Sequence, residues 1–149
     1  MSATKDFEEL FACFDRHSVR AMIVGAYAVA FHAKPRYTKD LDILVEPSEE
    51  NARRLIRALA DFGFGSLDLS PADFSSPGNI VQLGFPPNRI DLITAVDGIS
   101  FEEAWAGRVR GRFGEREVDY LGRKELIRNK EASGRAQDLL DLEWLREKE

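Results

Sequence analysis

Two aspartates, Asp40 and Asp42, stand one residue apart at the start of an apolar run. The alternating pattern predicts a β-strand over residues 40–45, and the side chains of a strand alternate between the two faces of its sheet. Both carboxylates would therefore project from one face, while the apolar residues pack on the other. Two acids this close repel each other unless a cation lies between them, and a divalent ion such as Mg²⁺ prefers oxygen ligands. We expect the pair to form half of a magnesium site.

A third carboxylate, Asp91, lies inside a second strand-like segment, residues 89–93. A proline-containing connection joins this segment to residues 80–85 and predicts a hairpin, which would bring Asp91 beside Asp40 and Asp42. Three acids can bind two metal ions roughly 4 Å apart, an arrangement that activates a hydroxyl and stabilises a leaving pyrophosphate in nucleotidyl transfer. The alternative interpretation is three surface acids on an exposed face of the sheet.

A candidate phosphate site precedes the acidic strand. Gly25 and Ala26 join an apolar strand-like segment, residues 20–24, to an alanine-rich segment, residues 26–33, that is compatible with a helix. The first N–H groups of such a helix are unpaired, and glycine lets a phosphate approach the backbone closely. The same order of elements is also common in proteins that bind no phosphate. Arg36 suits a pair of phosphate oxygens, and a surface ion pair is its alternative role.

The other polar and aromatic residues near this turn have open roles. Thr38 either positions Arg36 or a metal-bound water, or completes the local turn. His32 follows the glycine turn on the same segment, but a hydrogen-bonded histidine in the core or at a helix end is the favoured interpretation. Tyr27 and Tyr37 are of a type that stacks on a base, yet aromatic residues at such places usually pack. We leave the last three out of the site.

The bulk properties describe one acidic domain spanning residues 1–149. The chain has 44% hydrophobic residues, enough for a core, and a net charge of −5, which offers nucleic acid no general attraction. A single cysteine, Cys13, excludes an internal disulfide and suits a reducing cytoplasm, where we expect it to be a buried thiol. The longest uncharged apolar stretch, residues 21–31, is too short to cross a bilayer, and the N-terminus lacks the pattern of a secretory signal.

The remaining segments predict a mixed β-sheet with helices before, between and after its strands, an α/β fold of the α+β type. Helices are expected over residues 7–17, 48–63 and 101–106 and, after Leu121, as a pair broken around Ser133 and Gly134; further strands are expected over residues 108–113 and 117–121. Residues 65–77 predict a loop with one helical turn.

Three arginines, Arg108, Arg110 and Arg112, alternate along one of the predicted strands. Such a basic row usually protects an exposed sheet edge from pairing with a neighbouring chain. It can also contact a nucleic-acid backbone through the phosphate charges, so RNA is retained as an acceptor class.

As a set, these motifs resemble the DNA polymerase beta-type nucleotidyltransferase superfamily, and within it small proteins related to abortive-infection (AbiE-type) toxins. The resemblance spans most of the chain and depends on Val24-Gly25-Ala26, the run from Pro35 to Asp42, the run from Arg89 to Leu92, and Lys130 through Gly134-Arg135 to Asp138 and Asp141. It implies a minimal nucleotidyltransferase core followed by C-terminal helices. It further implies that a nucleoside triphosphate binds at the glycine turn, that the three acids hold Mg²⁺, with two ions when the nucleotide is bound, and that a nucleoside monophosphate moves onto an acceptor hydroxyl with release of pyrophosphate.

The resemblance also places Lys130 and Asp138 near the nucleotide. From the residues alone, Arg135 and Asp138 predict an i, i+3 ion pair on a helix surface, and Asp141 is favoured as a structural residue. One position departs from the family pattern, because Ala26 stands where Gly or Ser is usual and offers a phosphate only its backbone N–H.

Two functions therefore stay open at this point. The first is a magnesium-dependent nucleotidyltransferase with a protein, tRNA or small molecule as acceptor. Such an enzyme could also be one component of a toxin and antitoxin pair. The second is a catalytically degenerate member that acts by binding a partner protein such as an antitoxin. A sugar transferase that uses the Asp-x-Asp pair is disfavoured, because the chain leaves little room for a sugar-acceptor domain.

Overall fold

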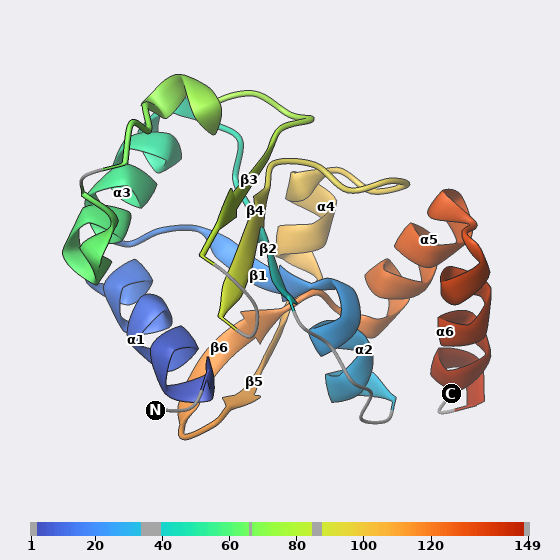
Figure 1. Ribbon diagram of the computed structural model, residues 1–149. Coiled ribbons are helices and arrows are strands. Elements are labelled where there is room, and N and C mark those ends of the chain that lie inside the picture. The colour runs from blue at the N-terminus through green and yellow to red at the C-terminus, as the bar shows by residue number, and fades with distance from the viewer. Residues whose placement is uncertain (1–2, 34–39, 66, 85–87, 148–149) are drawn as a thin grey trace.

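A mixed sheet of six strands forms the centre of the protein (Figure 1). The computed structural model describes residues 3–33, 40–65, 67–84 and 88–147. The strands lie in the order β3-β4-β2-β1-β6-β5. Their bounds are β1 Ala21–Val24, β2 Asp40–Val45, β3 Ile80–Leu83, β4 Arg89–Ile93, β5 Val109–Phe113 and β6 Arg116–Tyr120. The α/β fold with a mixed sheet, expected from the sequence, is confirmed.

Helices cover both faces of this sheet. They are α1 Ala3–Arg16, α2 Gly25–His32, α3 Glu49–Leu59, α4 Phe101–Ala106, α5 Arg123–Ser133 and α6 Ala136–Glu147, with a π-helical turn over Ala60–Phe64 and a 3₁₀ turn over Pro71–Asp73. In Figure 1, α1 and α3 lie on one side of the strands, and α2, α4, α5 and α6 lie on the other. None of the helices in the described ranges is both long and apolar enough to cross a membrane.

Local sequence signals set several helix ends. Ser48 caps α3, because its side chain accepts a hydrogen bond from the backbone N–H of Asn51. Gly134 ends α5 in the left-handed conformation, with φ of 59°, where a residue with a Cβ would be strained. These two signals account for the predicted start of α3 and for the predicted break between α5 and α6.

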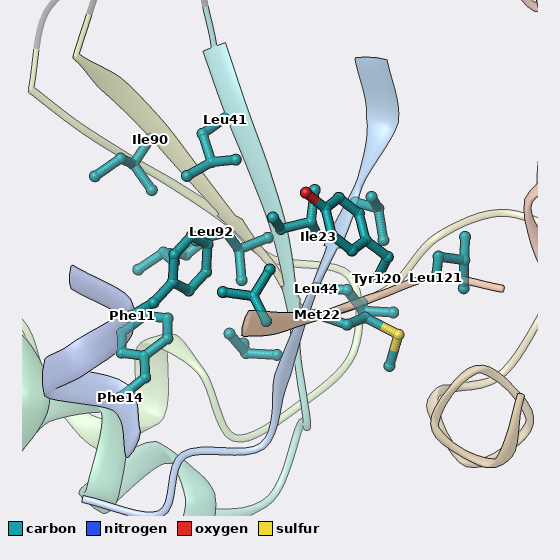
Figure 2. Close-up of a cluster of buried hydrophobic side chains, with 14 of the residues drawn as sticks. Phe11, Phe14, Met22, Ile23, Leu41, Leu44, Ile90, Leu92, Tyr120 and Leu121 are labelled. Carbon is teal, nitrogen blue, oxygen red and sulfur yellow. The ribbon is translucent and has the colours of Figure 1, made fainter. Parts of the chain in front are cut away.

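One face of the sheet packs into the main core. The alternation predicted for β2 is present, because Leu41 and Ile43 are fully buried on the side of α1. Figure 2 shows Phe11 and Phe14 of α1 gathered with Leu41, Ile90 and Leu92. Cys13 is also fully buried, as the sequence predicted.

Strand pairing brings the acidic segments together by a route different from the expected one. The hairpin of β3 and β4 is confirmed, but it places β3, not the acidic strand, against β4. Strand β2 joins β4 from the other side as a parallel neighbour, with Asp42 opposite Asp91. Two acids distant in sequence therefore meet through a parallel pairing, which the sequence pattern did not reveal.

Candidate active site

Four charged residues occupy neighbouring positions on one face of β2 and β4. Asp40 lies opposite Arg89, and Asp42 lies opposite Asp91. Residues two apart on a strand share a face, and directly paired residues of neighbouring strands do as well. The face that carries the acids is thus the one away from α1 and α3, and the structure brings all three predicted carboxylates onto it.

Asp42 and Asp91 are paired across the two strands, and their carboxyl groups interact. Burial raises the pKa of Asp42 to about 7, and the negative charge of Asp91, a hydrogen bond with its carboxyl group and the charge of Asp40 act in the same direction. The hydrogen bond requires a proton between two carboxyl groups. The two carboxylates would repel each other if both were charged, and a cation at this position would relieve that repulsion.

Arg89 supplies a positive charge to this face, a role that the sequence analysis missed. Its Nε lies 3.7 Å from Asp40 Oδ1 and 3.5 Å from Asp91 Oδ1, and its side chain is one-third exposed. The signal was available, because Arg89 precedes Asp91 by two residues in a strand and must share its face.

The glycine turn lies directly over Asp42. Gly25 has φ of +67°, and a Cβ at this position would overlap Asp42 Oδ2. Both the conformation and the space therefore require glycine. The helix α2 begins here without a side-chain hydrogen bond to its first N–H groups. Gly25 and Ala26 consequently present a backbone surface and a positive helix end next to the carboxylates.

A second charged cluster joins α5 to α6. Lys130 is 6% exposed, and its Nζ lies 3.1 Å from Asp138 Oδ1 and 3.3 Å from Asp141 Oδ2. Asp138 Oδ2 also accepts hydrogen bonds from Ser133 Oγ at 2.7 Å and from Arg135 Nε at 2.9 Å. We call these five residues the α5–α6 cluster.

The alternative position of Asp138, on a helix surface, is wrong, although its ion pair with Arg135 is confirmed. Asp138 is 1% exposed, because the turn at Gly134 folds α6 against α5 and directs this carboxylate toward Lys130. Burial by itself would raise the pKa of Asp138. The hydrogen bonds from Arg135, Ser133 and Lys130 outweigh this effect and hold the pKa well below its usual range.

Two cavities adjoin Asp42. One, of about 290 Å³, is lined by Ala26 and Asp40 and by residues of the α5–α6 cluster. The other, of about 360 Å³, extends toward Ile93 and Asp97. The residues that line both cavities are Gly25, Asp42, Lys130 and Arg135. The carboxylate face and the α5–α6 cluster therefore border one continuous hollow with two arms.

The donor set fits a magnesium site in chemistry but not in the present side-chain arrangement. Carboxylate oxygens are the ligands that Mg²⁺ prefers. Within the described ranges, however, no group of three or more His, Cys, Asp or Glu side chains converges as a metal site requires. A divalent ion among Asp40, Asp42 and Asp91 would have to displace the proton between the last two and the Arg89 side chain, so the metal site remains a prediction.

The other residues considered in the sequence analysis have separate outcomes. Arg36 and Thr38, with Tyr37, lie outside the described residues. His32 lies 2.7 Å from the carbonyl oxygen of Leu121 through its Nε2, and burial lowers its pKa, so the structural interpretation is confirmed. Tyr27 packs against the rings of Phe7 and Phe113, also as predicted.

The arginine row lies at the sheet edge formed by β5. Asp119 of the neighbouring strand pairs with Arg110 at 3.2 Å and lies 3.6 Å from Arg108. The Arg108 guanidinium also lies 3.7 Å from the centre of the Trp105 ring. The edge position agrees with the protective role, and the charges of two of the three arginines are already engaged within the protein.

Comparison with solved structures identifies the fold. ANT(2")-Ia, in complex with adenylyl-2"-tobramycin, is similar with a TM-score of 0.63 and 15% identity over 97% of this chain and 88% of that one. The lincosamide antibiotic adenylyltransferase LnuA, with lincomycin bound, is similar with a TM-score of 0.56 and 12% identity over 97% of both chains. An antigenic nucleotidyltransferase-like protein from Paracoccidioides brasiliensis is similar with a TM-score of 0.54 and 12% identity over 94% of this chain and 74% of that one.

The likeness is one of three-dimensional structure. No family model matches the sequence, and no curated protein matches it either. The chain therefore has the fold of nucleotidyltransferases, at a sequence identity that establishes the fold alone.

Proposed function

We propose that the protein is a magnesium-dependent nucleotidyltransferase that moves a nucleoside monophosphate from a nucleoside triphosphate to an acceptor hydroxyl. The observation that carries this proposal is the placement of Asp42 opposite Asp91 directly beneath the Gly25 turn. A backbone turn suited to phosphate and a pair of acids that a cation would stabilise lie side by side in the fold of nucleotidyltransferases. A reducing cytoplasm, which keeps a lone thiol such as Cys13 intact, is the proposed site of action.

Each residue has a proposed part in the reaction. Asp40, Asp42 and Asp91 would hold Mg²⁺, which when bound neutralises phosphate charge and orients the reacting groups. The N–H groups of Gly25 and Ala26 would bind phosphate oxygens, with Lys130, Asp138, Arg36 and Thr38 assigned to the nucleotide site by the family resemblance. Asp91 would accept the proton of the acceptor hydroxyl. The nucleotidyl group then bonds to the acceptor oxygen as the bond to pyrophosphate breaks.

A small-molecule acceptor and an adenine nucleotide are the proposed substrates. Two structures of the same fold are described with small molecules, adenylyl-2"-tobramycin in one and lincomycin in the other. The net charge of −5 and the internal pairing of Arg108 and Arg110 give little support to RNA.

A degenerate, partner-binding protein is the second candidate. It is motivated by Ala26, which lacks the phosphate-binding hydroxyl, and by Arg89, which places a cation of the protein itself on the carboxylate face. Its partner would be another protein, such as the antitoxin of a toxin and antitoxin pair.

Pyrophosphate release tests the first candidate. The protein is incubated with MgATP and a mixture of small hydroxyl compounds, and Asp42→Asn is compared with Asp68→Asn, whose aspartate is exposed and remote from the cavities. We expect Asp42→Asn to lose at least about a hundredfold of the rate, because metal-assisted charge stabilisation contributes several kcal/mol. Asp68→Asn should retain it. Equal rates in the native protein and Asp42→Asn would exclude the site, and absence of MgATP binding in calorimetry would favour the second candidate.

A further inference from the structure

An apolar cavity of about 610 Å³ lies beyond the site described above. It lies between the ends of β2 and β4 and the start of α4, and its apolar walls include Leu44, Pro47, Val96, Ile99 and Phe101. We call it the α4 cavity. Its volume is within the range of small-molecule sites, which is about 300–1,000 Å³. Neither the proposed metal nor the triphosphate site uses it.

The α4 cavity continues the active-site hollow along the same face of the sheet. Ala95 and Val96 line both this cavity and the 360 Å³ arm beside Asp42. Leu44 and Glu46 follow Asp42 at intervals of two residues, so Leu44 shares the face of the carboxylates and Glu46 continues it beyond the strand end. At about 3.3 Å per residue, the cavity walls lie about 7 to 13 Å from Asp42 along the strand.

The chemistry of the walls favours an uncharged group over phosphate. Among the described residues, no lysine or arginine lines this cavity. Its two acids are Glu46 and Glu102, and Glu46 is engaged by Arg20 Nη1 at 3.2 Å and by the Ser48 hydroxyl at 2.9 Å. An anion would meet these acidic oxygens, with no cationic side chain among the described lining residues to offset them. An apolar group would bury surface at about 25 cal/mol per Å².

We infer that the α4 cavity receives the apolar part of the acceptor. The acceptor is then a small amphipathic alcohol, with its reacting hydroxyl near Asp42 and Asp91 and an uncharged apolar group about 7 to 13 Å away. The identification of this ligand as the acceptor rests on the proposed function. The inference that the cavity binds apolar small molecules does not rest on it. Ligand binding and the role of the ligand as acceptor can therefore be refuted separately.

Binding is tested without nucleotide or turnover. The probe is 2-(2-naphthyl)ethanol, which carries a hydroxyl and an apolar ring system, and methyl glucoside is the polar control. We expect the naphthyl compound to cause saturable amide shift changes in NMR spectra at Val96, Ile99 and Phe101. Methyl glucoside should cause none there. Absence of these changes with the naphthyl compound, or equal changes with both, would overturn the inference.

A matched pair of tryptophan variants locates the probe. Ala95 is exposed at the passage between the cavities, so Ala95→Trp should narrow the passage without burying a misfit, whereas Ala106→Trp adds the same group on α4 away from the cavity. We expect Ala95→Trp to weaken probe binding at least about tenfold, the equivalent of 1.4 kcal/mol, and Ala106→Trp to leave it unchanged. The smaller Ala95→Leu should give an intermediate loss if the tryptophan variant does not fold. Unchanged binding in both Ala95 variants would show that the probe binds elsewhere. Displacement of the probe by adenosine would show that the cavity receives the nucleotide base and not the acceptor.

Transfer of label from ATP then identifies the acceptor. The native protein is expected to label apolar alcohols and not tRNA, and Ala95→Trp should lose this labelling while Ala106→Trp keeps it. Labelling of tRNA that persists in Ala95→Trp would overturn the acceptor assignment. Saturable binding of the naphthyl compound with no transfer to any hydroxyl would refute the proposed function and leave the cavity as a ligand site.

Discussion

Two charged groups border the same hollow, and they differ in their balance of charge. In the α5–α6 cluster, Lys130 and Arg135 offset Asp138 and Asp141. On the carboxylate face, Arg89 is the one cation beside the three acids among the described residues of β2 and β4. The charge of Lys130 also acts on Asp42 from the α5–α6 cluster. The first group pairs its charges as a stable ion network requires, whereas the second has more negative than positive charge among the described residues. The imbalance marks where a ligand cation is expected, and the balanced cluster provides the rigid wall beside it.

The pKa values express the same difference. Hydrogen bonds hold the pKa of Asp138 well below its usual range, which stabilises its charged form. Burial and the neighbouring acids raise the pKa of Asp42 to about 7, which destabilises its charged form. A carboxylate in the first setting contributes to folding, and one in the second opposes it at neutral pH. Substitutions that remove each acid should therefore change stability in opposite directions.

The largest effect is expected from Asp138→Ala. Removal of this carboxylate leaves Lys130 with fewer partners in a buried site and should cost about 3 kcal/mol of the free energy of unfolding at pH 7. Because its folded pKa lies below the unfolded value, this contribution should be lost in the native protein as pH falls through and below about 4. Urea unfolding measures both effects, with Asp68→Ala as the exposed control. A loss as small as that of the control would mean that the cluster adds nothing to stability.

An opposite and smaller effect is expected from Asp42→Asn. In metal-free buffer at pH 8 it should raise the free energy of unfolding by about 1 kcal/mol, because a buried charge is removed. The folded pKa exceeds the unfolded one, so the native protein should lose stability as pH rises from about 4 to 8, while Asp42→Asn should lose less. Denaturant unfolding at both pH values checks this, and parallel pH profiles for the two proteins would contradict it.

The role of Arg89 can be separated from that of a metal ion. Arg89→Gln removes the only cation seen on the carboxylate face of β2 and β4 in the described part of the chain. We expect it to bind Mn²⁺ about threefold to tenfold more tightly without nucleotide, since this corresponds to about 1 kcal/mol of lost competition. Electron paramagnetic resonance of free Mn²⁺ gives the affinity. Arg89→Lys, which keeps the charge, should resemble the native protein, and weaker Mn²⁺ binding by Arg89→Gln would show that Arg89 does not compete.

The smallest effect concerns the glycine turn. Ala26→Ser restores a hydroxyl at a position that lines the 290 Å³ cavity. One added hydrogen bond to phosphate is worth about 1 kcal/mol, so MgATP should bind about fivefold more tightly in calorimetry. Ala30→Ser, later on the same helix, should not change the affinity. An equal change in both variants would point to the helix and not to the turn.

The local elements could be predicted from the sequence for identifiable reasons. Alternation of acids with Leu41 and Ile43 predicted the strand β2, and the glycine at position 134 predicted the break between the last two helices. Such signals are short-range, because a strand period or a helix cap depends on residues only a few positions apart. The motif containing Asp40, Asp42 and Asp91 was equally visible, although its metal-binding role remains a prediction.

Only the tertiary structure decided how these pieces meet. The parallel pairing that sets Asp42 against Asp91 and the cavity between β2 and α4 join residues far apart in the chain. The burial of Asp138 beside Lys130 depends on how α6 packs against α5. The sequence by itself determined the elements, the face of each strand and the types of chemical group available, because these follow from local periodicity. Strand order, burial and the shape of cavities depend on how whole elements pack, and no local pattern contains that information.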